Sequence, residues 1–147
     1  MAGRLLGAGV NPEEMYRRIY ASVPVGRMHL LRDALATLEV DSAIGLGWLS
    51  VPADALERYK LKGEELDGIV EYARSIAGTR LALFFRDLGH GRVKISFRST
   101  GNVDANCFAR QFGGGGHARA SGALVTGTLD EVRDRVVLAA REFLAKS

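Results

Sequence analysis

Residues 79–99 constrain the fold more than any other part of this 147-residue chain, because they predict a β-hairpin. The first segment, 79–88, is nearly all apolar, and the second, 92–99, alternates apolar and polar residues. A Gly-His-Gly turn joins them, as is typical of a hairpin with a short loop. Because an apolar strand is buried on both sides, we expect the first strand to lie near the centre of a sheet that helices cover.

Periodic patterns on both sides of the hairpin predict helices and two further strands. A Thr-Leu-Asp-Glu capping box at residue 128 opens the last helix. The expected helices are 12–22, 26–39, 52–59, 66–76, 104–111 and 128–145, and the expected strands are 42–51 and 123–126. The sequence therefore predicts an α/β (α+β) fold. It has an N-terminal helical hairpin in residues 1–40 and, in residues 41–147, a small mixed β-sheet with a central hairpin flanked by helices.

Composition excludes several classes of protein. The longest apolar runs are five residues, far short of the roughly 20 that cross a bilayer, so we expect no membrane association. The N-terminus lacks the pattern of a secretion signal, and the expected location is cytoplasmic. Cys107 is the single cysteine, which rules out an internal disulfide, and the three histidines show no zinc spacing.

Basic residues are concentrated between residues 92 and 119. On the second strand of the hairpin, Lys94, Ser96 and Arg98 point to one side and the apolar residues to the other. Ser99 follows at the strand end. A row of donors without an acid nearby in the sequence favours an anion as ligand. An exposed antiparallel face with polar side chains is the alternative interpretation.

Four successive glycines are the second candidate for anion binding. Gly113, Gly114, Gly115 and Gly116 follow a predicted helix, and His117 comes directly after them. Successive amides of such a run can form a concave nest for phosphate or carboxylate oxygens. A flexible loop or a tight crossing from helix to strand would need the same glycines. The Lys and Ser or Thr that end a nucleotide P-loop are absent.

These two features together resemble a known family. The sequence Ser-Phe-Arg-Ser at 96–99, followed by Phe-Gly-Gly-Gly-Gly-His-Ala-Arg-Ala-Ser-Gly at 112–122, resembles the C-terminal domain that accompanies the Asp-His-His (DHH) catalytic domain of phosphoesterases. The four-glycine form is most similar to the bacterial oligoribonuclease and pAp phosphatase group. Residues 1–40 look like the end of a DHH catalytic domain and its connector, and residues 41–147 like the substrate-binding domain.

The resemblance implies a phosphoesterase that degrades short oligoribonucleotides from the 5′ end, dephosphorylates pAp, or does both. It implies that Arg98, Ser99 and residues 113–117 bind substrate, in agreement with the anion interpretation. The Asp-rich motifs that hold manganese in the family are absent from this sequence. We therefore expect no cofactor on this chain, manganese on a DHH catalytic domain as partner, and no hydrolysis by this chain alone.

Three other interpretations stay open at this point. A RecJ-type single-strand exonuclease carries a similar domain with a shorter glycine run. A stand-alone nucleic-acid or nucleotide-binding module would capture RNA or nucleotide phosphates without chemistry. A structural oligomerisation domain, for example a homodimer, is permitted by the glycine-rich strand near Trp48.

Overall fold

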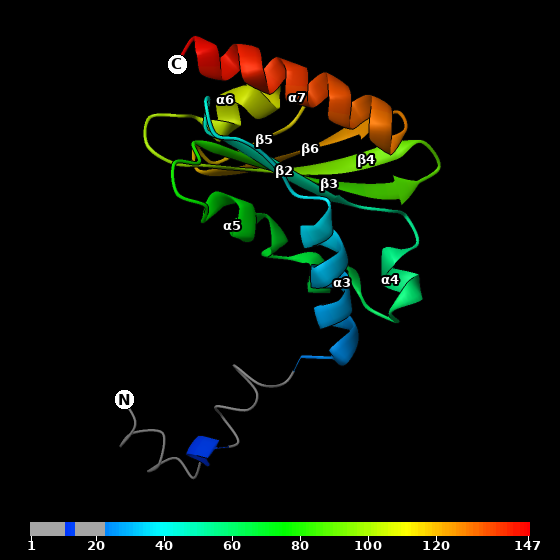
Figure 1. The fold of residues 1–147 in the computed structure, drawn as a ribbon. Coiled ribbons are helices and arrows are strands. Elements are labelled where there is room, and N and C mark those ends of the chain that lie inside the picture. The colour runs from blue at the N-terminus through cyan, green and yellow to red at the C-terminus, as the bar shows by residue number, and fades with distance from the viewer. Residues whose placement is uncertain (1–10, 14–22) are drawn as a thin grey trace.

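The computed structural model describes residues 11–13 and 23–147 (Figure 1). The helix predicted for residues 12–22 lies largely outside the described residues, and with it the pairing of helices expected in residues 1–40.

Within residues 23–147, six strands form one sheet with the order β1-β2-β3-β4-β6-β5. The strands are β1 (Glu39–Asp41), β2 (Leu46–Val51), β3 (Leu81–Gly89), β4 (Arg92–Ser99), β5 (Gly115–Gly116) and β6 (Ala120–Thr126). β2 and β3 run parallel, and every other neighbouring pair is antiparallel. β3 and β4 form the predicted hairpin at the centre, which confirms the expected mixed sheet.

Helices lie on both sides of this sheet, as Figure 1 shows. α6 (Ala105–Arg110) and α7 (Leu129–Ala145) cover one side. α3 (Val25–Ala36), α4 (Ala55–Arg58), the 3-10 helix η1 (Gly63–Leu66) and α5 (Ile69–Arg74) lie on the other. The side-chain caps predicted for two helices are present: Asp104 accepts from the amide of Cys107, and Thr128 accepts from the amide of Glu131. The α+β fold is thus confirmed.

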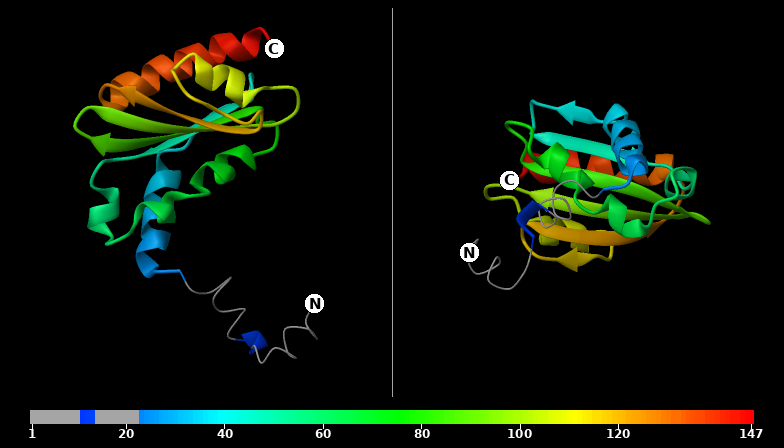
Figure 2. Two further views of the ribbon diagram at one scale, coloured as in Figure 1. Left: turned by 180° about the vertical axis from the view of Figure 1, so that it is seen from behind. Right: turned by 90° about the horizontal axis from the view of Figure 1, so that it is seen from below.

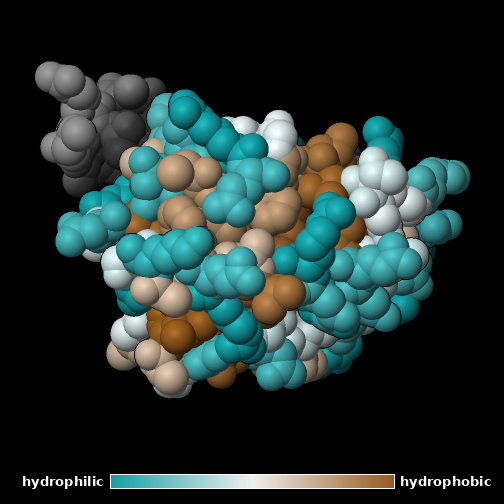
Figure 3. Space-filling view, turned by 90° about the horizontal axis from the view of Figure 1, so that it is seen from above, coloured by the Kyte–Doolittle hydropathy of each residue, from teal (hydrophilic) through white to brown (hydrophobic). Residues whose placement is uncertain are grey.

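Alternation along the strands divides the apolar residues into two cores. The side of the sheet that carries Val93, Ile95 and Phe97 of β4, all fully buried, packs against α6 and α7; we call it the sealed face. The side that carries Lys94 and Arg98 is called the open face. There, Ala82 and Phe84 of β3 pack against α3 and α5. From above, over α7, the surface is mostly hydrophilic with smaller hydrophobic areas (Figure 3).

Several predicted boundaries were wrong, and the pairing of the backbone explains two of them. The helix predicted to reach Glu39 ends at Ala36, and Glu39–Asp41 pairs with β2 as an edge strand. Thr37 fixes this exit, since its hydroxyl donates to the carbonyl of Ala34 and accepts from the amide of Ser50. The strand predicted from residue 42 begins at Leu46, after a turn with Gly45 at φ +74°.

Candidate functional site

Among the described residues, helices cover only one half of the open face of the sheet. α3 packs on β2, and α5 packs on β2, β3 and β4. β6 lies beyond these helices. Its residue Leu124 pairs with Lys94, so its side chain is on the open face, and it is 52% exposed. The view from below in Figure 2 keeps β6, in orange, in sight beside the helices. Side chains of β4 and β6 on this face, such as those of Lys94 and Leu124, are therefore accessible to a ligand.

A hollow lies where the covering helices end. Its volume is about 110 Å³, enough for a few water molecules or one small anion. The connection that leads into α5 forms one wall, and strands β3 and β4 form the floor. The lining residues are Leu66, Asp67, Gly68, Val70, Phe84, Arg86, Lys94, Ser96 and Arg98. Three cations thus face one carboxylate, Asp67, across the hollow.

Lys94, Ser96 and Arg98 stand in one row on the open face, as the alternation predicted. Lys94 is exposed, and among the described residues its ammonium group has no hydrogen bond or ion pair. Ser96 and Arg98 are half-buried and line the hollow. The row is therefore available to a ligand.

Arg98 has an acidic partner that the local sequence does not show. Its Nε donates to Glu71 Oε1 at 3.0 Å, and its Nη1 donates to the carbonyl of Phe97 at 2.9 Å. Glu71, on α5, also pairs with Arg74. The row therefore has an acidic neighbour in the folded chain, although none lies near it in the sequence. Within the described part of the chain, Nη2 is the Arg98 nitrogen without a hydrogen bond, so both of its N–H groups can donate to an anion.

Ser99 does not join this row. It is 1% exposed and its side chain points to the opposite side of the sheet from that of Arg98. The hydroxyl donates to the carbonyl of Ala118 at 2.8 Å, and the amide of Ser99 donates to the carbonyl of Arg119. Ser99 therefore holds the loop that follows the glycine run and has no access to the hollow.

The glycine run does not form the free anion nest that the sequence suggested. Four of the amides in residues 113–117 already donate to the protein: Gly113 to the carbonyl of Arg110, Gly114 to that of Ala109, Gly116 to Asn106 Oδ1, and His117 to the carbonyl of Ala120. The run is a tight crossing from α6 to β5, which was the alternative interpretation.

Close packing or a positive φ explains three of these four glycines. A Cβ on Gly114 would lie 2.0 Å from the carbonyl oxygen of Gly122, and Gly113, in the turn after α6, has φ +76°. Gly115 is different: it is exposed, and a Cβ there would meet only Asn106 Oδ1, at 3.3 Å. The imidazole of His117 is also exposed. These two residues remain accessible to a ligand.

Strand register brings the two predicted features onto one surface. Ser96 of β4 pairs with Gly122 of β6, which pairs with Gly115 of β5. Neighbouring strands are about 4.8 Å apart, so Gly115 lies about 10 Å from Ser96. The two glycines carry no side chains. The register thus places two residues without side chains in line with Ser96, and we call them the glycine shelf.

Sequence reasoning missed Arg86, Asp67 and Glu71 at this site. Arg86 had a detectable signal, since a hairpin centred on the Gly-His-Gly turn pairs it with Lys94. Asp67 and Glu71 come from the segment before β3 and approach through tertiary packing alone. No local pattern marks them.

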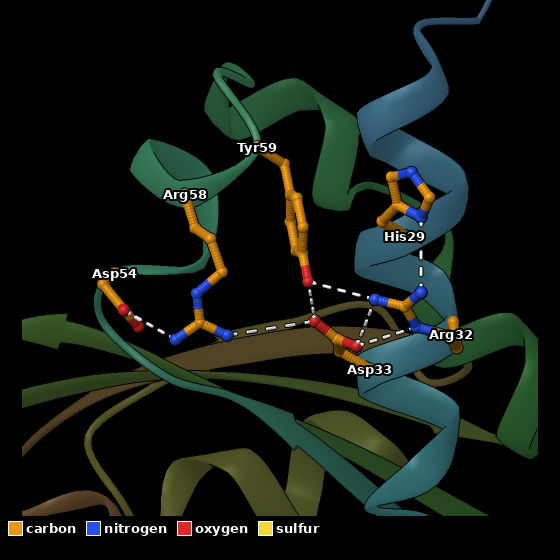
Figure 4. Close-up of polar contacts among 6 residues, drawn as sticks. All are labelled: His29, Arg32, Asp33, Asp54, Arg58 and Tyr59. Atoms are coloured by element: carbon orange, nitrogen blue, oxygen red, sulfur yellow. Dashed lines mark hydrogen bonds and ion pairs between the residues drawn. The ribbon is translucent and has the colours of Figure 1, made fainter.

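A separate polar network joins α3 to α4 (Figure 4). The phenol of Tyr59 donates to Asp33 Oδ2, and Arg32 Nη2 donates to the Tyr59 oxygen at 3.3 Å. The hydrogen bond from Tyr59 lowers the pKa of Asp33, with smaller contributions from the two neighbouring guanidinium groups. The network comprises His29, Arg32, Asp33, Asp54, Arg58 and Tyr59. It fixes the two helices to each other and lies outside the hollow.

Residues 11–13 and 23–147 contain no group of three or more His, Cys, Asp and Glu side chains that could hold a metal ion. In the same residues, no helix is long and apolar enough to cross a bilayer. The residues described thus do not fit a manganese ion.

Comparison with known proteins identifies relatives of the whole chain. Residues 50–146 match the DHHA1 domain family. The bifunctional oligoribonuclease and PAP phosphatase NrnA of Thermus thermophilus is 35% identical over 148 residues, which include all of this chain and 44% of that protein. A second match, to the protein of the same name from Bacillus subtilis, is 35% identical over 81 residues, 55% of this chain and 25% of that protein.

Solved structures show the same architecture. An exopolyphosphatase-related protein from Bacteroides fragilis has a TM-score of 0.78 and 27% identity, over 99% of this chain and 42% of that one. A pGpG-specific phosphodiesterase from Vibrio cholerae has a TM-score of 0.57 over 90% of this chain and 41% of that one, and its 16% identity shows the fold alone. The chain spans less than half the length of each of these four proteins.

Proposed function

Because the chain belongs to the DHHA1 domain family, we propose that it is the substrate-positioning part of a DHH-family phosphoesterase. The proposed substrates are short 5′-phosphorylated oligoribonucleotides and pAp. The similarity to an oligoribonuclease and PAP phosphatase along the whole chain supports this choice over a RecJ-type exonuclease.

The basic row beside the bare glycine shelf carries this proposal. Lys94, Ser96 and Arg98 present donors at the hollow, and the shelf next to them lets a ligand approach the backbone closely. Cations and neutral donors suit phosphate oxygens. A shelf without side chains suits a flat nucleoside. Together they match a short nucleotide chain better than a free carboxylate.

The role of this chain is to bind and orient. Glu71 and the carbonyl of Phe97 hold the Arg98 guanidinium in one position, which reduces the freedom it loses when phosphate binds. A substrate held at a fixed position reacts more readily with a separate catalytic group. Manganese, which in this proposal belongs to a DHH catalytic domain, would supply an activated water there. The partner of the open face is then that catalytic domain.

The first test is binding by the 147-residue chain. Arg98→Ala is expected to weaken binding of a 5′-phosphorylated RNA dinucleotide by about 1.5–3 kcal/mol, because a charge-assisted contact is lost. Isothermal titration calorimetry measures this. Arg135→Ala, an exposed arginine on α7, is the control and should change little. Equal affinities of wild type and Arg98→Ala would remove Arg98 from the site.

The second test separates an enzyme from a stand-alone binding module. Hydrolysis of a 5′-phosphorylated dinucleotide is measured with a DHH catalytic domain, with and without this chain. Stimulation that Arg98→Ala reduces supports the proposal. Tight binding without any stimulation would favour the module. A cytoplasmic location and a homodimer stay predictions, which localisation in cells and light scattering can check.

A further inference from the structure

Arg86 and Lys94 lie directly opposite each other on the open face. They are paired residues of β3 and β4, and both line the hollow. Like charges placed opposite each other in an antiparallel pair destabilise a sheet. An anion bound between the two charges would reduce this repulsion and stabilise the sheet at the hollow.

Neither cation has an acidic partner among the described residues. No hydrogen bond or ion pair joins the side chain of Arg86 or Lys94 to any other described residue, whereas Arg98 is paired with Glu71. Asp67 is the one carboxylate that lines the hollow, and it is exposed. The guanidinium of Arg86 packs against Gly63, where a Cβ would come within 3.3 Å of Nη2. That contact places Arg86 without neutralising it.

We propose that Arg86 and Lys94 form a second phosphate subsite, with Ser96 at its floor. Arg86 is half-buried and Lys94 exposed, so the subsite combines a positioned guanidinium with a mobile ammonium group. The inference that inorganic phosphate binds at this subsite is independent of the proposed function. The inference that the bound phosphate belongs to a short RNA rests on the proposed function.

The subsite is distinct from the one at Arg98. Lys94 and Arg98 are four residues apart on one strand, a separation of about 13 Å. Glu71 and the Phe97 carbonyl hold the Arg98 guanidinium near α5, so the two ends cannot grip one phosphate together. A short RNA would place its terminal phosphate at one end and a later phosphate at the other. The Arg86–Lys94 pair would then increase the affinity for RNAs long enough to reach both subsites.

The experiment compares two ligands on the wild-type 147-residue chain and on two variants, Arg86→Gln and Lys94→Gln. Inorganic phosphate is titrated while NMR follows the Arg86 Nε proton and the Ser96 amide. Affinities are then measured for 5′-phosphorylated RNA of two and of four nucleotides at several salt concentrations. Arg135→Gln, which removes an equal charge from the outer side of α7, is the matched control.

We expect inorganic phosphate to shift both signals in the wild type and to shift Ser96 much less in either variant. We expect the tetranucleotide to bind roughly tenfold or more tightly than the dinucleotide. Either variant should remove this gain and lower the salt dependence of tetranucleotide binding by about one released counterion. Arg86→Gln, which lies outside the basic row, should also leave dinucleotide binding within about twofold of the wild type.

The subsite and the proposed function fail in different ways. If both variants keep the gain with length, or lose the two RNAs equally, there is no separate subsite, while loss of binding in Arg98→Ala still supports the proposed function. If the wild type binds neither RNA and phosphate still shifts Ser96 through Arg86 and Lys94, the proposed function fails and the phosphate subsite stands. If phosphate shifts nothing and length brings no gain, the subsite is overturned.

Discussion

The two faces of the sheet are made by the same strands and differ in what covers them. On β4, Val93, Ile95 and Phe97 are fully buried under α6 and α7, whereas Lys94 alternates with them and is exposed. On β3, the open face is apolar at Phe84, beneath α5, and becomes cationic at Arg86, where the helices end. Polar residues of the open face therefore begin where the covering helices end.

This difference separates stability from binding along a single strand. Residues of odd number on β4 contribute to the core, and residues of even number are free to serve a ligand. Because a strand alternates strictly, a substitution on one face leaves the other face in place. Variants that change stability and binding together would contradict this separation.

The largest expected effect is on the sealed face. Phe97→Ala removes a fully buried ring that packs edge-on against Phe108, with centroids 5.5 Å apart. The free energy of unfolding should fall by about 3–5 kcal/mol, because a cavity replaces the ring. Urea unfolding of the 147-residue chain measures it.

Ser96→Ala, one position away on the open face, is the matched control. Its free energy of unfolding should stay within about 0.5 kcal/mol of the wild type. Comparable losses in the two variants would mean that the open face also stabilises the fold.

An intermediate effect is expected in the glycine run, where the backbone of β5 belongs to neither core. Gly114→Ala places a Cβ against the Gly122 carbonyl, which should destabilise the chain by about 1–3 kcal/mol. Gly115→Ala meets only the side chain of Asn106 and should be tolerated. Urea unfolding of both variants is the measurement. Equal losses would contradict the assignment of Gly115 as the accessible residue.

The smallest effect concerns the polar network of α3 and α4. The folded-state pKa of Asp33 is lowered chiefly by the hydrogen bond from Tyr59. Its contribution to stability is therefore fully present above the ordinary value of 3.8 and is lost as pH falls through the folded pKa. In Tyr59→Phe the pKa of Asp33 should rise toward that value, so the variant should lose less stability between pH 5 and pH 2.

Carboxyl NMR titration of Asp33 and urea unfolding against pH check this expectation. Tyr72→Phe, a half-exposed tyrosine on α5, is the control and should titrate as the wild type does. An unchanged Asp33 in Tyr59→Phe would show that another group sets its pKa.

The sequence predicted the features that depend on neighbours along the chain. The central hairpin, the alternation of β4 and the capped helices all follow from local patterns, and each was found. The row of Lys94, Ser96 and Arg98 came with them, because strand alternation alone decides which side chains share a face. The shape of the fold and half of the candidate site were therefore predictable.

The other half depends on partners distant in sequence. Glu71 reaches Arg98 across 27 positions, and β1 is a strand only because β2 pairs with it. The glycine run was ambiguous for another reason, since a nest and a tight crossing need the same residues. Only the acceptors of their amides, in α6 and at the start of β6, distinguish the two.

The hollow is bounded by two strands of the sheet and by a surface connection. Its floor is fixed by the ladder of β3 and β4, where a one-residue slip would turn the apolar core outward. Its wall belongs to the connection from β2 to β3, and surface connections accept insertions and exchanges at little cost. Lengthening that connection would reshape the mouth without moving Arg86 or Lys94. Relatives that share this floor can therefore diverge in the ligands they admit while keeping the proposed phosphate contacts.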